Sequence, residues 1–217
     1  MITLDPRHPR RLLAVALLLP PALGLGGCQA PTTPPPLHGA EDSAWFLVGG
    51  ATFLQEDGDV IHGIGRDLPR NSFLVSRATY ADFELEVELR IDGGNSGIQV
   101  RSAVDQEAVR VVGYQIEVDP SERAWSGGLY DEGRRGWLDP NEGKEEARAA
   151  FDPEGWNHYR IRCEGDRIRS WVNGVPCADW RDDLDAEGHV ALQVHGGEKI
   201  DVWWRGLRIE RIGTAAD

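Results

Sequence analysis

The sequence has no surplus of positive charge. Its 23 Lys and Arg residues are outnumbered by 36 Asp and Glu residues, which gives a formal net charge of −13 at pH 7. Binding to nucleic acid or to an anionic membrane face needs basic side chains that replace the counterions of phosphate. The composition therefore excludes nucleic acid as a partner, whereas 41% hydrophobic residues are enough for a folded domain.

The chain also lacks a hydrophobic run that is long enough to cross a bilayer. Residues 12–19 are apolar, but a membrane-spanning helix needs roughly 20 such residues. Arginines precede this run, as in a signal peptide, and Leu25-Gly26-Gly27-Cys28 follows it. This segment resembles the lipobox of bacterial lipoproteins, in which the cysteine is lipidated. The alternative is an ordinary cleaved signal in which Cys28 is incidental.

We therefore predict a lipoprotein signal peptide over residues 1–27, and lipidated Cys28 with a Pro-rich linker over residues 28–42. Several acyl chains on one cysteine hold a protein stably on a membrane surface. The predicted location is the bacterial cell envelope, on its periplasmic or outer-surface side, with the membrane as a partner through Cys28.

No segment of helix length shows an amphipathic pattern. Residues 83–91 instead alternate between apolar and charged side chains, which is the pattern of a half-buried strand. The same alternation appears in 97–101, 114–118, 159–163 and 191–195. No second linker or repeat interrupts residues 43–213. We therefore predict one all-β domain over this range, an antiparallel β-sandwich.

Only two cysteines fall inside this domain, Cys163 and Cys177. Asn173-Gly174 predicts a two-residue hairpin turn, and a second Gly-containing turn precedes it. In this meander Cys163 faces Ile168, which faces Asp179, so that the two thiols lie about 12 Å apart. A disulfide needs Cα atoms within about 7 Å. We predict two buried free thiols.

Three of the expected strands carry polar residues of an unusual kind. They are Gly97, Gln99 and Arg101; Gln115, Glu117 and Asp119; and Ala191, Gln193 and His195. A solvated face is usually dominated by Lys and Glu, so Gln, His and single Arg and Glu residues favour a surface that holds a polar ligand. The alternative is an ordinary outer face. The Gly-rich segment 127–137 adds acids, arginines and aromatics to the ligand interpretation.

Six blocks in this order resemble the 3-keto-disaccharide hydrolase domain family. The blocks are Asn95-Ser96-Gly97-Ile98, Gly113-Tyr114-Gln115-Ile116-Glu117, Gly128-Leu129-Tyr130, Gly155-Trp156-Asn157-His158-Tyr159, Trp171-Val172-Asn173-Gly174 and Leu192-Gln193-Val194-His195-Gly196-Gly197. The resemblance implies a concanavalin-like jelly-roll β-sandwich of two antiparallel sheets. It also implies a hydrolase or lyase that acts on glycosides oxidised at carbon 3. A non-catalytic, surface-anchored glycan-binding sandwich is the alternative.

A ketone at carbon 3 acidifies the hydrogen on carbon 2, so a base can remove it and the enolate can expel the substituent on carbon 1. This route needs a base, a donor for the enolate oxygen and an acid for the leaving oxygen. Glu117 or His195 is the expected base, and Arg101 is expected to hold the enolate oxygen. Glu132 or Tyr130 is expected to protonate the departing oxygen.

The remaining expectations concern binding. The candidate substrate-binding residues are Asn95, Gln99, Gln115, Tyr130, Arg134, Arg135, Trp137 and Gln193. A divalent metal held by His195, Glu117 and Gln193 is the alternative to Arg101, although no metal-ligand spacing motif is present. The expected ligand is a 3-keto glycoside or another carbohydrate, and a sugar oxidoreductase acting upstream is a candidate partner because it would make the ketone.

Overall fold

The computed structural model describes residue 37 and residues 43–213. The predicted signal peptide, Cys28 and most of the linker lie outside the described residues, so the anchoring and domain boundaries stay predictions. None of the helices within the described ranges is long and apolar enough to cross a membrane.

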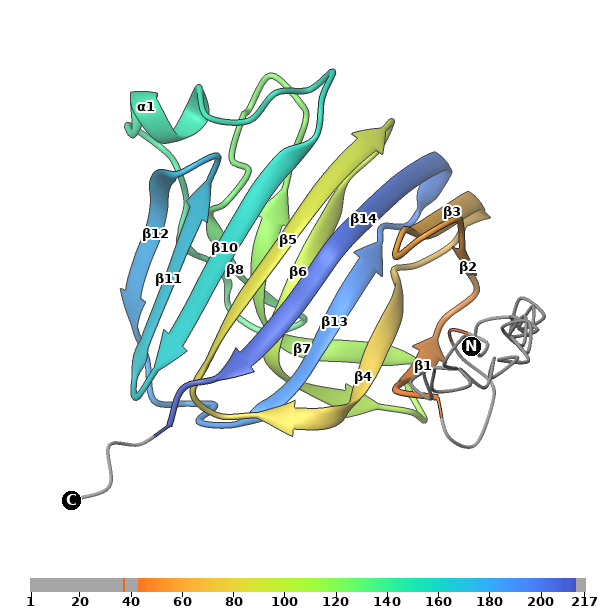
Figure 1. The fold of residues 1–217 in the computed structure, drawn as a ribbon, viewed down its shortest axis with the longest axis horizontal. Coiled ribbons are helices and arrows are strands. Elements are labelled where there is room, and N and C mark those ends of the chain that lie inside the picture. The colour runs from red at the N-terminus through yellow and green to blue at the C-terminus, as the bar shows by residue number, and fades with distance from the viewer. Residues whose placement is uncertain (1–36, 38–42, 214–217) are drawn as a thin grey trace, which may run out of the picture. The chain divides into compact units, whose positions relative to one another are not determined.

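The domain is built from two antiparallel sheets of seven strands each, which Figure 1 shows as separate layers. The first sheet has the order β1 (Trp45–Val48), β4 (Ser72–Tyr80), β13 (Gly188–Val194), β6 (Ser96–Asp105), β7 (Arg110–Val118), β8 (Leu129–Glu132), β9 (Gly136–Asp139). The second has the order β12 (Val175–Arg181), β11 (Arg167–Val172), β10 (Asn157–Glu164), β5 (Phe83–Asp92), β14 (Gly197–Arg211), β3 (Ile61–Leu68), β2 (Thr52–Gln55). The short helix α1 (Glu145–Arg148) lies between β9 and β10 in the chain. The predicted all-β sandwich is confirmed.

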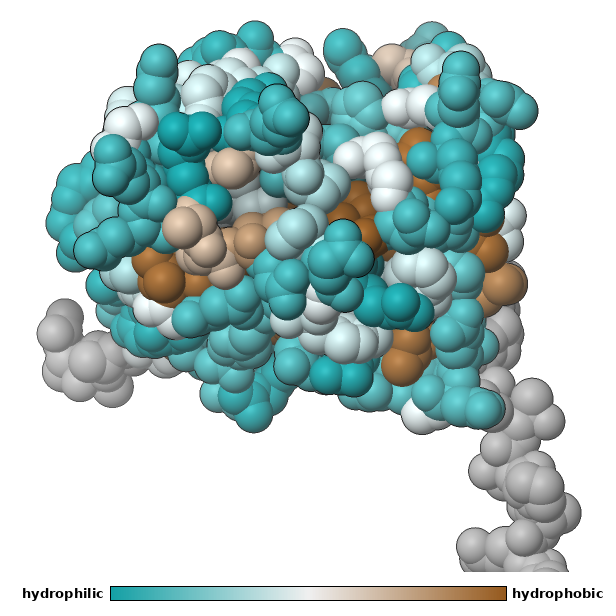
Figure 2. All heavy atoms as spheres, turned by 90° about the horizontal axis from the view of Figure 1, so that it is seen from above, coloured by the Kyte–Doolittle hydropathy of each residue, from teal (hydrophilic) through white to brown (hydrophobic). Residues whose placement is uncertain are grey.

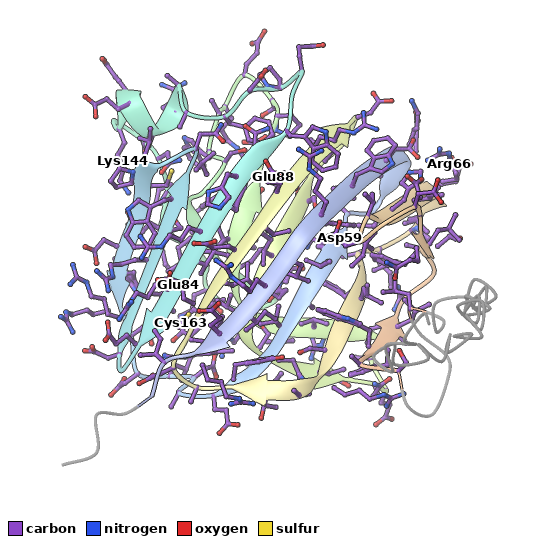
Figure 3. All side chains as sticks on the ribbon, viewed as in Figure 1. Asp59, Arg66, Glu84, Glu88, Lys144 and Cys163 are labelled. Carbon is purple, nitrogen blue, oxygen red and sulfur yellow. The ribbon has the colours of Figure 1, made fainter. Side chains whose placement is uncertain are left out.

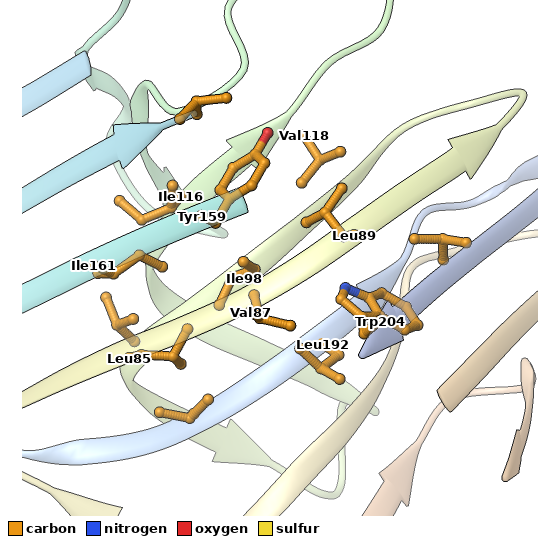
Figure 4. Packing of buried hydrophobic residues seen from close by; sticks show 14 of the residues in the cluster. Leu85, Val87, Leu89, Ile98, Ile116, Val118, Tyr159, Ile161, Leu192 and Trp204 are labelled. Atoms are coloured by element: carbon orange, nitrogen blue, oxygen red, sulfur yellow. The ribbon is translucent and has the colours of Figure 1, made fainter. Parts of the chain in front are cut away.

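Strand β5 shows why the alternating sequence folds in this way. Its apolar residues, among them Leu85 and Leu89, are fully buried between the sheets. They pack against residues of both sheets, such as Ile98 and Trp204 (Figure 4). Burial of one apolar face is the main force that fixes the register of such a strand.

The other face of β5 carries glutamates that form ion pairs with neighbouring strands. Glu84 lies 2.7 Å from Arg160 of β10, and Glu88 lies 2.7 Å from Arg205 of β14 (Figure 3). The surface seen in Figure 2 is accordingly mostly hydrophilic, with hydrophobic side chains visible as smaller patches.

Both domain cysteines are free and buried, as predicted. Cys163 pairs in register with Ile168, also as predicted. The predicted pairing of Ile168 with Asp179 is wrong, because a register shift between β11 and β12 places Trp180 there instead. A bulge adds one residue to one strand, which moves every later partner by one position. Burial raises the pKa of Cys163 to about 12, so this thiol stays protonated.

Candidate functional site

The strands with unusual polar residues are neighbours in the first sheet, in the order β13, β6, β7, β8. Gly97 of β6 lies between Gln193 and Glu117 in register, and Gln115 of β7 is opposite Tyr130 of β8. The alternate residues of these strands, such as Ile116, belong to the core. The polar side chains therefore share the face of the sheet that points away from the core.

A cleft of about 420 Å³ opens on this face. It is lined by Gly94, Asn95, Gln115, Glu117, Asp119, Ser121, Arg123, Tyr130, Glu132, Trp137 and His195. Most of the predicted site residues therefore meet in one place, although they come from four parts of the sequence.

Glu117 is a deeply buried acid of the cleft, with 4% of its surface exposed. Asn95 Nδ2 donates to its Oε1 over 2.6 Å, and Gln115 Nε2 donates to its Oε2 over 3.0 Å. Burial raises the pKa of Glu117, and these two hydrogen bonds and the charge of Arg123 only partly oppose that rise. A carboxyl group with a raised pKa is suited to taking and returning a proton near neutral pH.

A set of amides below the cleft fixes the orientation of Gln115. Gln99 Nε2 and Gln193 Nε2 each donate to Gln115 Oε1 over 2.8 Å. Because both donors occupy the oxygen, the NH₂ group of Gln115 must face Glu117. Gln99 and Gln193 themselves are buried and do not line the cleft. Gly97 leaves the space for Gln115, since a Cβ at that position would lie 2.4 Å from Gln115 Cδ.

His195 and Glu132 form the opposite part of the cleft lining. His195 Nδ1 lies 2.7 Å from the carbonyl oxygen of Gly196, and a carbonyl can only accept, so Nδ1 carries a proton and Nε2 has a lone pair only when the ring is neutral. Burial raises the pKa of Glu132, whereas a hydrogen bond from Asn71 and the charge of His195 lower it by less. Burial and nearby carboxylates also raise the pKa of Tyr130, which therefore stays protonated. Glu132 and Tyr130 both remain candidates for the acid.

Arg123 is the residue that sequence reasoning missed. Its Nε donates to Asp119 Oδ2 over 2.7 Å, and its Nη2 lies 3.5 Å from Glu117 Oε1. The guanidinium is 5.0 Å from the ring centroids of both Trp125 and Trp137, a cation–π geometry. Arg123 lies in a loop, where the sequence has no alternation of apolar and polar residues. The only feature of the sequence that could have indicated its role is its position four residues after Asp119, with which it forms an ion pair.

The ion pair with Arg123 also settles the charge of Asp119. Burial alone would raise the pKa of this carboxyl, but hydrogen bonds from Ser121 and Arg123 outweigh burial and lower it. Asp119 is therefore an ionised partner that holds Arg123 in place.

Arg101 does not take part in the cleft, and the expectation that it shares this face is wrong. The register between β6 and β7 shifts after Val100, and Arg101 has a φ of 47°. Its buried guanidinium donates to Ala81 O over 2.7 Å, to Gly165 O over 2.7 Å and to Asp82 Oδ1 over 2.9 Å. Arg101 thus joins the β4–β5 turn to the β10–β11 turn.

Arg134 and Arg135 also lie outside the cleft lining. Both form ion pairs with Asp131, and each has a second acidic partner between β12 and β13. Their guanidinium groups lie 5.5 and 5.9 Å from the ring of Tyr114. The structure therefore gives these arginines a place in an ion-pair network rather than at a ligand.

The three proposed metal ligands do not meet at one point of the cleft, because Gln193 lies below Gln115. In the part of the chain that the structure describes, no group of three or more His, Cys, Asp or Glu side chains is arranged to hold a metal ion.

A family model described as the 3-keto-α-glucoside-1,2-lyase-like domain matches residues 38–210. A comparison with curated proteins gives no significant match. The carbohydrate-binding module CBM66 from Bacillus subtilis is similar in structure, with a TM-score of 0.59 and 20% identity over 77% of this chain and 95% of that one.

Two further structures share the fold with similar TM-scores. A putative glycosyl hydrolase from Parabacteroides distasonis has a TM-score of 0.53 and 20% identity, covering 74% of this chain and 90% of that one. A lichenase from a mouse hindgut metagenome has a TM-score of 0.54 and 13% identity, covering 82% and 98%. These likenesses confirm the predicted concanavalin-like jelly-roll sandwich, which serves both binding modules and enzymes.

Proposed function

Because the chain belongs to the 3-keto-α-glucoside-1,2-lyase-like domain family, we propose that it cleaves 3-keto glycosides by elimination across carbon 2 and carbon 1. One observation carries this proposal: a single cleft holds two carboxyl groups with raised pKa values, Glu117 and Glu132, together with the cation Arg123. A lectin needs stacking and neutral hydrogen bonds, but it has no need of buried acids with perturbed pKa values.

In the proposed reaction Glu117 is the base. It removes the hydrogen on carbon 2, and the electron pair moves onto the ketone oxygen to form an enolate. Arg123 takes the part first expected of Arg101, since its guanidinium lies beside Glu117 and would stabilise the enolate oxygen. His195 is the alternative base, because in the neutral ring its Nε2 has a lone pair.

The enolate then collapses and breaks the bond between carbon 1 and the leaving oxygen, which takes a proton from Glu132 or Tyr130. Water then adds to the resulting double bond: its hydroxyl bonds to carbon 1, Glu117 returns its proton to carbon 2, and the remaining proton of the water goes to the acid. The net reaction is a hydrolysis. Tyr130 and Trp137 supply aromatic surface for the sugar ring. Their ring centroids lie 5.1 Å apart in a T-shaped arrangement.

The test is to incubate the mature protein with a 3-keto glucoside and with its unoxidised parent, and to follow release of the leaving group. We expect cleavage of the keto compound alone, because without the ketone the hydrogen on carbon 2 is too weakly acidic for a side-chain base. Cleavage of both at similar rates would point to hydrolysis by paired carboxylates. Loss of activity with a chelator would move the role of Arg123 to a metal ion.

The alternative function is glycan binding without turnover. It is favoured by the fold shared with a carbohydrate-binding module, which shows that this sandwich can serve binding alone. Tight binding of the keto and parent sugars, with turnover of neither, would support it.

We further propose that the protein acts at the bacterial cell envelope, held there by lipidated Cys28. A sugar oxidoreductase in the same compartment would then supply the 3-keto substrate, because this chain has no oxidising step of its own in the proposed reaction.

A further inference from the structure

A second cavity of about 480 Å³ adjoins the cleft. Glu132 lines both cavities. Asn71, which lines the second, donates to Glu132 Oε1 over 2.9 Å and accepts from Gly196 N over 2.9 Å. Glu132 and Asn71 therefore stand where the two spaces meet, and a ligand that fills both must pass this pair.

The two cavities differ in charge. The cleft contains three acids, Glu117, Asp119 and Glu132, against one arginine. The second cavity is lined by Arg70 and Arg110, and Arg110 is paired with Asp105 at 3.3 Å.

Arg70 has no such partner. Its Nη1 donates to the carbonyl of Ala108 over 3.4 Å, and among residues 43–213 no carboxylate forms an ion pair with it.

The second cavity also offers apolar surface. Val109, which lines it, has 37% of its surface exposed, and the buried ring of Phe73 also belongs to the lining. An apolar wall beside an unpaired guanidinium suits an organic group that carries a carboxylate, sulfate or phosphate.

Resting on the proposed function, we propose that the second cavity is the leaving-group subsite and that Arg70 selects glycosides whose leaving group bears an anionic substituent. The sugar ring then occupies the acidic cleft, and the bond between carbon 1 and the leaving oxygen lies beside Glu132. This placement makes Glu132, and not Tyr130, the acid that gives its proton to the departing oxygen. Glu132 regains a proton in the water-addition step.

The experiment uses the full mature protein and compares two 3-keto glucosides, one with 4-hydroxyphenylacetate as leaving group and one with the corresponding amide. The methylene group insulates the phenol oxygen, so the two leaving groups differ chiefly in charge. We expect wild type to prefer the acid. Arg70→Gln should lower the ratio of the two kcat/KM values about tenfold, mainly through KM, which is the effect of one lost charge-assisted hydrogen bond.

Arg208→Gln is the matched control, since it removes one positive charge from β14 in the other sheet and should leave the ratio unchanged. An Arg70→Gln ratio equal to that of wild type, with both compounds still cleaved, would overturn the subsite alone. An equal fall of the ratio in Arg208→Gln would show that the net charge of the protein, and not Arg70 itself, sets the preference, and it would also overturn the subsite. Cleavage of neither compound by wild type would overturn the proposed function and the subsite together.

Discussion

Replacement of Glu117 by Gln keeps the size of the side chain and removes its ability to accept a proton. General base catalysis is typically worth 10² to 10⁴ in rate, so kcat/KM should fall by about that factor, or by about 2.7 to 5.4 kcal/mol in the barrier. Binding should largely survive, because the amide that replaces the carboxyl group can still hydrogen-bond within the cleft. The assay is release of the leaving group from a 3-keto glucoside, with ligand binding followed separately.

The raised pKa of Glu117 also determines how the free energy of unfolding changes with pH. The unfolded chain loses the Glu117 proton near the ordinary pKa of about 4.3, whereas burial raises the pKa in the folded state. The folded state is therefore penalised as the pH rises above the ordinary value, and the penalty is complete above the raised pKa. Glu117→Gln removes this penalty, but it also places an NH₂ group opposite one of the two amide donors, Asn95 or Gln115. The lost hydrogen bond does not depend on pH, so the melting temperature of the variant relative to wild type should be higher at pH 7 than at pH 4.

Wild-type activity should rise with pH through a pKa above the ordinary Glu value, and the variant should lack that limb. An active Glu117→Gln beside an inactive His195→Ala would refute the assignment and make His195 the base. A melting temperature that does not rise relative to wild type between pH 4 and pH 7 would refute the account of the buried carboxyl.

The remaining predictions test the other parts of the structure. Arg123→Gln should lower kcat by about 10² to 10³, as for loss of one donor to a developing oxyanion, and an unchanged kcat would remove Arg123 from the reaction. Arg101→Met should cost about 3 kcal/mol of unfolding free energy in urea, because it removes the buried cation that pairs with Asp82 and donates to two carbonyls. The folded variant should stay active, and lost activity with intact stability would return Arg101 to the site. Cys28→Ser should release the protein from membrane fractions, and persistence in those fractions would contradict lipidation. Cys163 and Cys177 should both react with an alkylating agent after denaturation without reductant, and detection of a linked peptide by mass spectrometry would contradict the free thiols.

Period-two alternation was sufficient to predict strands over 83–91, 97–101, 114–118, 159–163 and 191–195, whereas short strands such as β1, β2, β8 and β9 were not predicted from it. Glu117 and Gln115 could be placed on the polar face from sequence because no bulge interrupts β7 between Gln115 and Val118. The same reasoning failed for Arg101, since a bulge reverses the faces and neither Val100 nor Ser102 marks it in the sequence.

The sequence could not predict that Arg123 and Arg70 line the cavities, and the reason differs from that for Arg101. Each is exposed and lies in a loop, where no periodic burial dictates which way a side chain points. Their placement depends on partners that only the fold brings near, such as Trp137 for Arg123 and the carbonyl of Ala108 for Arg70.

The amides around Glu117 have a consequence for the fate of an abstracted proton. Asn95 and Gln115 both donate to this carboxyl, and the amides of Gln99 and Gln193 prevent Gln115 from turning its oxygen around. A proton newly bound to Glu117 thus finds no acceptor in Gln115 and must point toward the open side of the cleft, where the proposed substrate would lie. A deuterium label on carbon 2 would then exchange slowly with solvent, and partial return of the label to the same face of the sugar would give the reaction an isotopic memory.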